Sequence, residues 1–148
     1  MKIKLMHTIK IGNLLLGALL TSGLALAQAG EKTEAKVSIP ATVEAIWQSI
    51  DQRTDELDHA IQTNVLGEVH HHAYAIRDLV TALPGRSKSL PPDKLAQVKA
   101  NVAFVSTLAQ RLDASGDAKD KAGTEANFKK LKDILNSIRK NYPASNKT

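Results

Sequence analysis

Four segments of this chain place apolar residues at alternating spacings of three and four, the pattern that predicts amphipathic helices. The positions on these faces are Val43, Ile46, Trp47, Ile50, Thr54, Leu57 and Ile61 in the first segment, Leu66, Val69, Ala73, Ile76, Val80 and Leu83 in the second, Leu95, Val98, Val102, Val105, Ala109 and Leu112 in the third, and Phe128, Leu131, Leu135, Ile138 and Tyr142 in the fourth. No β-hairpin signal and no long repeat competes with this pattern. The sequence therefore predicts an all-α fold.

Residues that favour turns and helix ends separate the four segments. Pro40 opens the first helical pattern, and Asn64, which tolerates a left-handed backbone, ends it shortly before Gly67. Proline or glycine marks the remaining boundaries, at residues 83–85, 90–93, 115–117 and 142–143. Helices of roughly 20 residues with short connections favour an up-down-up-down four-helix bundle. Fusion of the first two segments into one long helix stays open as an alternative.

The N-terminus has the parts of a secretion signal. These parts are a basic region with Lys2, Lys4 and Lys10, an apolar run over residues 11–27, and the small residues of Ala25-Leu26-Ala27 at its end. The apolar run is shorter than the roughly 20 residues that a membrane-spanning helix needs. We therefore expect cleavage after Ala27, or after Ala29 as the second choice, and a secreted, periplasmic product with no stable membrane insertion.

This prediction divides the chain into four parts. They are a signal peptide at 1–27, a flexible leader at 28–39, the helical bundle at 40–143 and a flexible tail at 144–148.

Removal of the signal changes the charge and the ligand chemistry. It leaves 121 of the 148 residues, with 17 basic against 15 acidic side chains, so the basic pI of the whole chain does not indicate nucleic-acid binding. The chain has no cysteine, and both methionines, Met1 and Met6, lie in the signal. The mature protein therefore has no thiolate or thioether ligand, which excludes iron–sulfur clusters, c-type haem and zinc–thiolate sites.

Charge is distributed unevenly along the mature chain. Residues 41–62 carry a net charge of −4, and residues 128–148 carry a net charge of +5. Two interpretations stay open. The two segments can be solvated faces that attract each other inside the bundle, or the basic last helix can contact a partner protein or an anionic surface of the cell envelope.

Three consecutive histidines, His70, His71 and His72, are the most informative candidate for chemistry. At about 100° per residue, a regular helix places His70 and His72 on opposite flanks of the apolar stripe and His71 towards solvent. All three therefore cannot bind one ion, and a metal site needs groups from the preceding helix.

The two possible handednesses of the bundle place different residues opposite the histidines. In the first, Asp58 and His59 lie opposite His70, with His71 nearby. In the second, the seam holds Arg53 and Ala60 against Glu68 and His72.

The first handedness predicts a metal site. We expect Asp58, His59, His70 and His71 to form it, because imidazole and carboxylate ligands suit Zn(II), Cu(II) or Ni(II). Such binding weakens below about pH 6, where histidine is protonated. The alternative is a salt-bridged seam in which Asp51 pairs with Arg77 and Asp58 with His70.

Other chemistry is not expected. Glu68-x-x-His71 is half of a di-iron carboxylate motif, but its partner motif is missing. A haem site is not expected either, since it needs two inward imidazoles on facing helices. Residues 113–120 hold three carboxylates, but their glycine is misplaced for a calcium loop. The sequence therefore predicts a protein that is not an enzyme.

A resemblance adds to this interpretation. Residues 66–79, which contain the three histidines and Tyr74, on a secreted chain with four helical segments, resemble small uncharacterised periplasmic four-helix proteins, similar in shape to soluble b-type cytochromes. The resemblance implies a periplasmic helical bundle with a link to metal handling. The chain departs from the cytochrome pattern because it has neither a mature methionine nor a histidine in its last helix.

These observations lead to two functional hypotheses. The first is a non-enzymatic periplasmic protein that weakly sequesters a divalent transition metal through the four predicted ligands. The second is an interaction module that docks a partner protein or an envelope surface through its charged helix faces.

Overall fold

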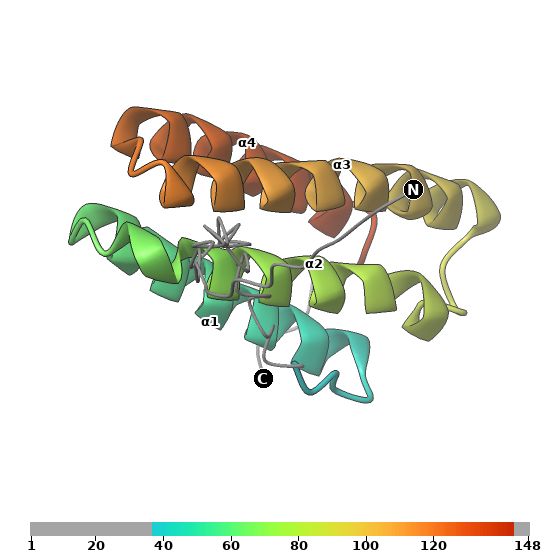
Figure 1. The fold of residues 1–148 in the computed structure, drawn as a ribbon. Helices are drawn as coiled ribbons and strands as arrows, with labels where there is room; N and C mark the ends of the chain where they lie inside the picture. Colours follow the sequence, from blue (N-terminus) through green and yellow to red (C-terminus); the bar gives the residue numbers. More distant parts are fainter. Residues whose placement is uncertain (1–36, 144–148) are drawn as a thin grey trace, which may run out of the picture. The chain divides into compact units, whose positions relative to one another are not determined.

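Four α-helices and one short 3₁₀ turn make up the part of the chain that the structure, a computed structural model, describes, residues 37–143 (Figure 1). The elements are α1 (Val43–Gln62), η1 (Leu66–Glu68), α2 (Val69–Arg86), α3 (Pro92–Asp117) and α4 (Lys121–Arg139). Residues 37–143 contain no strand, which confirms the predicted all-α class. The predicted signal peptide, most of the leader and the tail at 144–148 lie outside the described residues.

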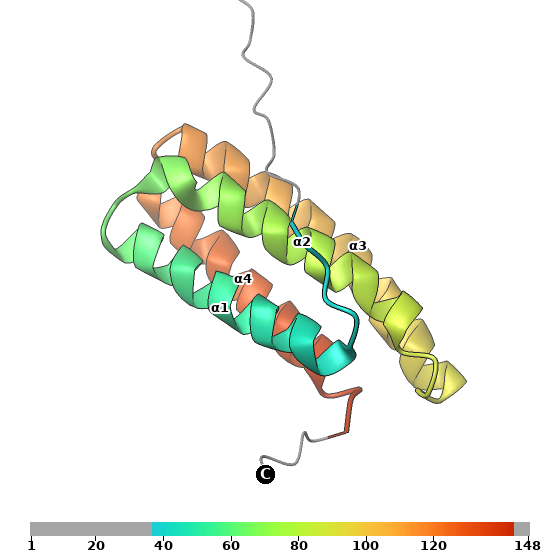
Figure 2. The same ribbon diagram turned by 90° about the horizontal axis from the view of Figure 1, so that it is seen from below.

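Consecutive helices lie side by side (Figures 1 and 2). α1 also contacts α4, though less extensively than it contacts α2. All four helices contribute to one apolar core, whose largest fully buried side chains include Ile46, Ile50, Leu57, Ile61, Ile76, Leu79, Leu83, Leu112, Leu131 and Ile138. Most of the apolar positions expected from the spacing pattern therefore face this core.

Three of the four described helices begin where a side chain accepts from an N–H group of the first turn, or where proline has no N–H group to satisfy. The Thr42 hydroxyl accepts a hydrogen bond from the Ala45 amide at 3.2 Å, so α1 begins at Val43 rather than at Pro40. Pro92 occupies the first turn of α3, as the sequence predicts. The Asp120 carboxylate accepts from the Gly123 amide at 2.9 Å and begins α4.

The helix ends agree with the sequence except after α2. Asn64 adopts a φ of 60°, so α1 and α2 are separate helices and the single long helix is not formed. α2 continues through Pro84 to Arg86, beyond the predicted stop at 83–85. Pro84 lies in the last turn, where its missing N–H costs one hydrogen bond only. The Ser87 hydroxyl then donates to the Leu83 carbonyl oxygen at 2.6 Å.

Gly116 permits a close contact between the end of α3 and η1. A Cβ atom at this position would lie 2.9 Å from the Leu66 carbonyl oxygen and 3.1 Å from Cβ of Val69. A side chain there would push the two elements apart, so glycine sets the distance at which α3 packs on the start of α2.

None of the helices in residues 37–143 is both long enough and apolar enough to cross a membrane.

Candidate functional site

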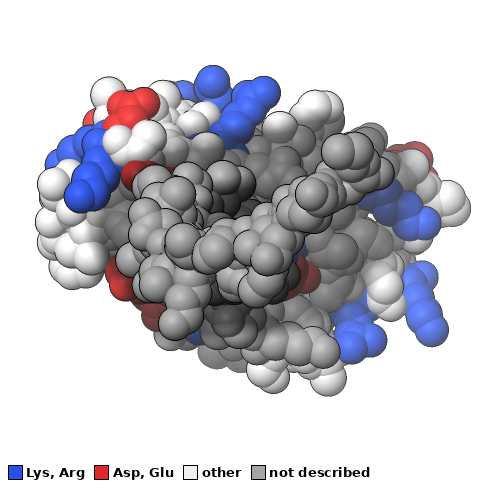
Figure 3. Space-filling view, viewed as in Figure 1, with Lys and Arg blue, Asp and Glu red and all other residues white. Residues whose placement is uncertain are grey.

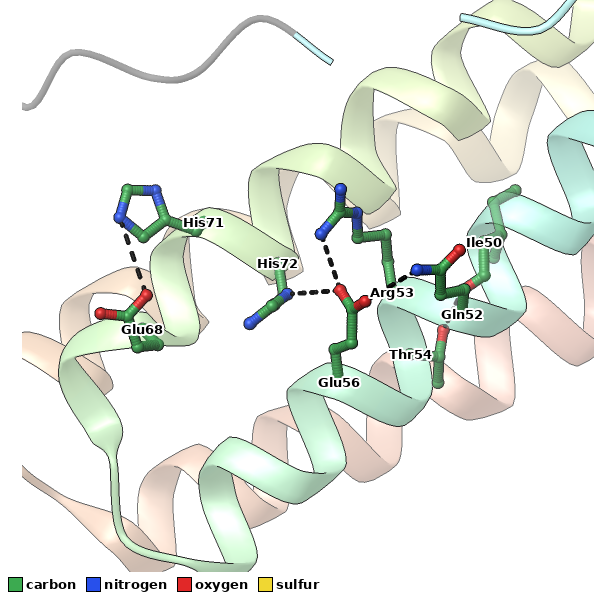
Figure 4. Close-up of polar contacts among 8 residues, drawn as sticks. All are labelled: Ile50, Gln52, Arg53, Thr54, Glu56, Glu68, His71 and His72. Atoms are coloured by element: carbon green, nitrogen blue, oxygen red, sulfur yellow. Dashed lines mark hydrogen bonds and ion pairs between the residues drawn. The ribbon is translucent and has the colours of Figure 1, made fainter. Parts of the chain in front are cut away.

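A network of polar side chains closes the outer seam between α1 and α2 (Figure 4). Glu56 accepts hydrogen bonds from Arg53 Nη1 at 2.7 Å and from Gln52 Nε2 at 2.9 Å. His72 Nδ1 lies 3.2 Å from Glu56 Oε2, but the two atoms are not aligned as a hydrogen bond. The seam therefore brings Arg53 and His72 together, as in the second of the two arrangements, with Glu56 between them.

Burial controls the protonation of this network. Burial is the largest influence on His72 and lowers its pKa, the Glu56 carboxylate opposes that change, and the Arg53 charge adds to it. For Glu56, burial acts to raise the pKa, but the hydrogen bond from Gln52 and the charge and hydrogen bond of Arg53 outweigh it and lower the pKa. The network therefore favours a neutral imidazole beside an ionised carboxylate.

The four residues predicted to bind a metal do not form one group in residues 37–143. Asp58 accepts a long hydrogen bond, 3.4 Å, from Gln62 of its own helix, and His59 is exposed. His71 Nε2 lies 3.9 Å from Glu68 Oε2, on the side of α2 away from the α1–α2 seam (Figure 4). Within residues 37–143, no group of three or more His, Asp or Glu side chains is placed to hold a metal ion.

The salt-bridged alternative has different partners from those expected. The structure pairs Asp51 with Arg139 of α4, across the α1–α4 contact. The guanidinium of Arg139 also lies over the Trp47 ring, 4.4 Å from its centroid. The acidic first helix and the basic last helix therefore attract each other inside the bundle at this point, as one of the two charge interpretations expects.

Two of the predicted ligands do lie together. The rings of His70 and His71 have centroids 3.7 Å apart, with 40° between their planes. His70 Nδ1 lies 2.8 Å from the Gly67 carbonyl oxygen, and this contact requires Nδ1 to carry the proton and donate it. In the neutral ring, Nε2 then keeps its lone pair, the state in which histidine binds metals.

An apolar groove lies on the outer seam between α3 and α4. It is a hollow of about 490 Å³, lined by Phe104, Thr107, Leu108 and Arg111 of α3 and by Lys130, Asp133 and Ile134 of α4. Leu108 forms part of the core, with 6% of its surface exposed, whereas Phe104 is 58% exposed. A large aromatic side chain therefore stands open to solvent at the wall of a hollow.

The charges at the rim of this groove are unbalanced. Asp133 is paired with Lys129 at 3.1 Å. Arg111 and Lys130 have no ion-pair partner among residues 37–143, so the rim presents two uncompensated cations. Figure 3 shows that Lys and Arg side chains also gather near the α3–α4 turn and around the α2–α3 connection.

Exposed alanines occur on both helices that line the groove. The exposed alanines are Ala96, Ala100, Ala103 and Ala114 on α3, and Ala122 and Ala126 on α4. The outward side of α3 therefore has few of the charged residues that normally cover the solvent face of a bundle helix.

The sequence analysis did not identify this groove. Phe104 lies next to the core residue Val105, but it does not follow the apolar spacing of the third segment. This position in the sequence already indicates that its side chain points away from the core. The contribution of Ile134 has no comparable signal, because only packing places it beside Phe104.

Comparisons with known protein families, with curated proteins and with solved structures found no match to this chain. The resemblance to small periplasmic four-helix proteins therefore stays a prediction.

Proposed function

We propose that this chain is a secreted, periplasmic, up-down-up-down four-helix bundle that acts as a non-catalytic interaction module. It docks a partner through the outer face of α3 and α4. The observation that carries the proposal is the exposed Phe104 at the wall of an apolar groove, with two cations at its rim, Arg111 and Lys130, that have no ion-pair partner among residues 37–143.

A face of this kind can supply free energy of binding to a partner. Solvent-exposed aromatic and arginine side chains are the residue types that contribute most binding energy at protein interfaces. Burial of apolar surface supplies affinity, and the unpaired rim charges supply orientation and selectivity. The histidine-containing seam between α1 and α2 offers neither feature, because Arg53 and His72 both lie close to the Glu56 carboxylate.

Site-specific photo-cross-linking tests this docking function. Phe104 is replaced by p-benzoylphenylalanine in cells that secrete the protein, and adducts are resolved by mass. We expect discrete adducts from position 104, reduced about tenfold by the double substitution Arg111→Glu and Lys130→Glu.

The same probe at Val65 is the matched control, because Val65 is 49% exposed but lies at the α1–α2 connection. It should give no adduct that depends on those two charges. The docking proposal is wrong if position 104 gives no discrete adduct, or if the charge reversals leave the adducts unchanged.

The arrangement of His70 and His71 favours weak binding of Cu(II), Zn(II) or Ni(II) as a second candidate function. Two adjacent imidazoles, one with its Nε2 lone pair directed by the hydrogen bond to Gly67, give fewer ligands than the four-residue site that the sequence predicts. We therefore expect weak binding that does not need Asp58 or His59.

Calorimetric titration with Cu(II) checks this second candidate. The double substitution His70→Gln and His71→Gln should reduce the affinity at least about tenfold, whereas Asp58→Asn and His59→Gln together should change it less than about twofold. Absence of any heat with the unmodified protein would rule out this candidate.

A further inference from the structure

The shape of the α3–α4 groove suits the side chains of a helix. Leu108 and Ile134 line it from opposite helices, and Phe104 stands at its wall. An incoming helix with apolar residues at spacings of three and four presents a ridge that fits such a groove, as in helix-in-groove recognition. The exposed alanines on both sides allow a second backbone to approach closely.

The positive charge at the rim of the groove favours an occupant with negative charge. Arg111 and Lys130 carry positive charge without an ion-pair partner in residues 37–143, while the one rim carboxylate, Asp133, is already paired with Lys129. A helix with Glu or Asp beside its apolar face would pair with both cations. A basic helix would meet like charge on desolvation, at a cost in binding free energy.

We infer that the α3–α4 groove binds an acidic amphipathic helix of a partner protein. This inference rests on the proposed docking function and specifies the chemistry of the partner. The apolar ridge of that helix contacts Phe104 and Leu108, and its carboxylates pair with Arg111 and Lys130.

Two other occupants fit the groove less well. A second copy of this chain, related by a two-fold axis, would place the same patch against itself and bring the cations of both copies together. An anionic lipid surface is flat, so it cannot fill a hollow between two helices, and Asp133 at the rim would face its phosphates. A helix is the occupant that matches both the hollow and the charge.

A designed peptide of about 18 residues tests the inference, because its composition is known and its length allows several helical turns. It carries leucine at helical spacings of three and four, glutamate on the flanks and a fluorescent label. Binding to the full chain is measured by fluorescence anisotropy. We expect saturable binding that Phe104→Ser weakens at least about tenfold, and that Arg111→Glu with Lys130→Glu also weakens about tenfold.

Matched variants and peptides distinguish binding in this groove from non-specific binding of the peptide to the protein surface. Lys99→Glu reverses an exposed charge of α3 outside the groove lining, and Val65→Ser removes the other large exposed apolar side chain of residues 37–143. Neither should change the affinity more than about twofold. A peptide with the same leucines spread around the helix, and one with lysine in place of glutamate, should bind at least about tenfold more weakly.

Three parallel measurements decide between the occupants. Equal binding of the designed and spread-leucine peptides, or no effect of Phe104→Ser, overturns the inference. Binding of phosphatidylglycerol vesicles that depends on Phe104, without peptide binding, overturns the acidic helix but leaves docking through this face intact. Phe104-dependent dimers in sedimentation would assign the groove to a second copy and also overturn the inference. If position 104 also gives no cross-link in cells, the docking function itself fails.

Discussion

The seam between α1 and α2 and the seam between α3 and α4 differ in the side chains that they expose to water. Between α1 and α2, Glu56 accepts a hydrogen bond from Arg53 of its own helix, and His72 of α2 lies 3.2 Å from the same carboxylate. Between α3 and α4, Phe104 and Ile134 leave a hollow, and the neighbouring cations lack partners in the described residues. The first seam holds its charged groups close to one another, and the second has an apolar surface and charge available to a second molecule.

A cluster of rare, reactive residues attracts attention in a sequence, but none of the three histidines lines the α3–α4 groove. His72 lies beside Glu56 of α1, and the rings of His70 and His71 lie together. An isolated phenylalanine among alanines has no such chemical signature. Its exposure becomes visible only when the adjacent helix is in place.

Substitution at two positions of the groove tests where the core stops and the open surface begins. Leu108→Ala should reduce the free energy of unfolding by about 2–5 kcal/mol, because the truncated side chain leaves a cavity in the core. Phe104→Ser should change it by less than about 1 kcal/mol, because the ring is mostly exposed.

Urea unfolding measures both values, with fluorescence of Trp47, the single tryptophan, as the signal. Equal losses for the two variants would mean that Phe104 belongs to the core. The groove would then not be an open surface, and the contrast between the two seams would disappear.

The pH dependence of stability tests the closed seam and has a smaller expected effect. Burial lowers the pKa of His72, so the folded state takes up its proton at lower pH than the unfolded state. Stability should therefore fall as the pH drops below about 6.5, and the loss should be complete once the pH is below the folded-state pKa. We expect about 1 kcal/mol or less, because Glu56 offsets part of the cost.

Unfolding at pH 7.5 and pH 5.5 checks this expectation in the unmodified protein and in His72→Gln. The variant should lose less stability between the two pH values. His59→Gln, which removes an exposed imidazole from α1, is the matched control and should keep the pH dependence of the unmodified protein. A pH dependence that is the same in His72→Gln would show that this seam does not depend on a neutral imidazole.

Helix positions and core residues were predictable because they depend on local chemistry. The spacing of Ile46, Ile50, Leu57 and Ile61 directs one face of α1 to the core whatever the bundle's handedness. The turn at Asn64 and the start at Pro92 are equally local, since each follows from the backbone preference of one residue. Pro84 was misplaced as a stop because a proline in the last turn costs a single hydrogen bond.

The all-α class, the four helical segments and most of their core residues follow from local patterns in the sequence. Which flanks of neighbouring helices meet depends on the tertiary structure. That choice placed Arg53 with His72 and Asp51 with Arg139, and it left Phe104 exposed beside Ile134. The physical reason is that helical periodicity specifies the direction of each side chain around its own axis, whereas bundle handedness depends on packing summed over all four helices.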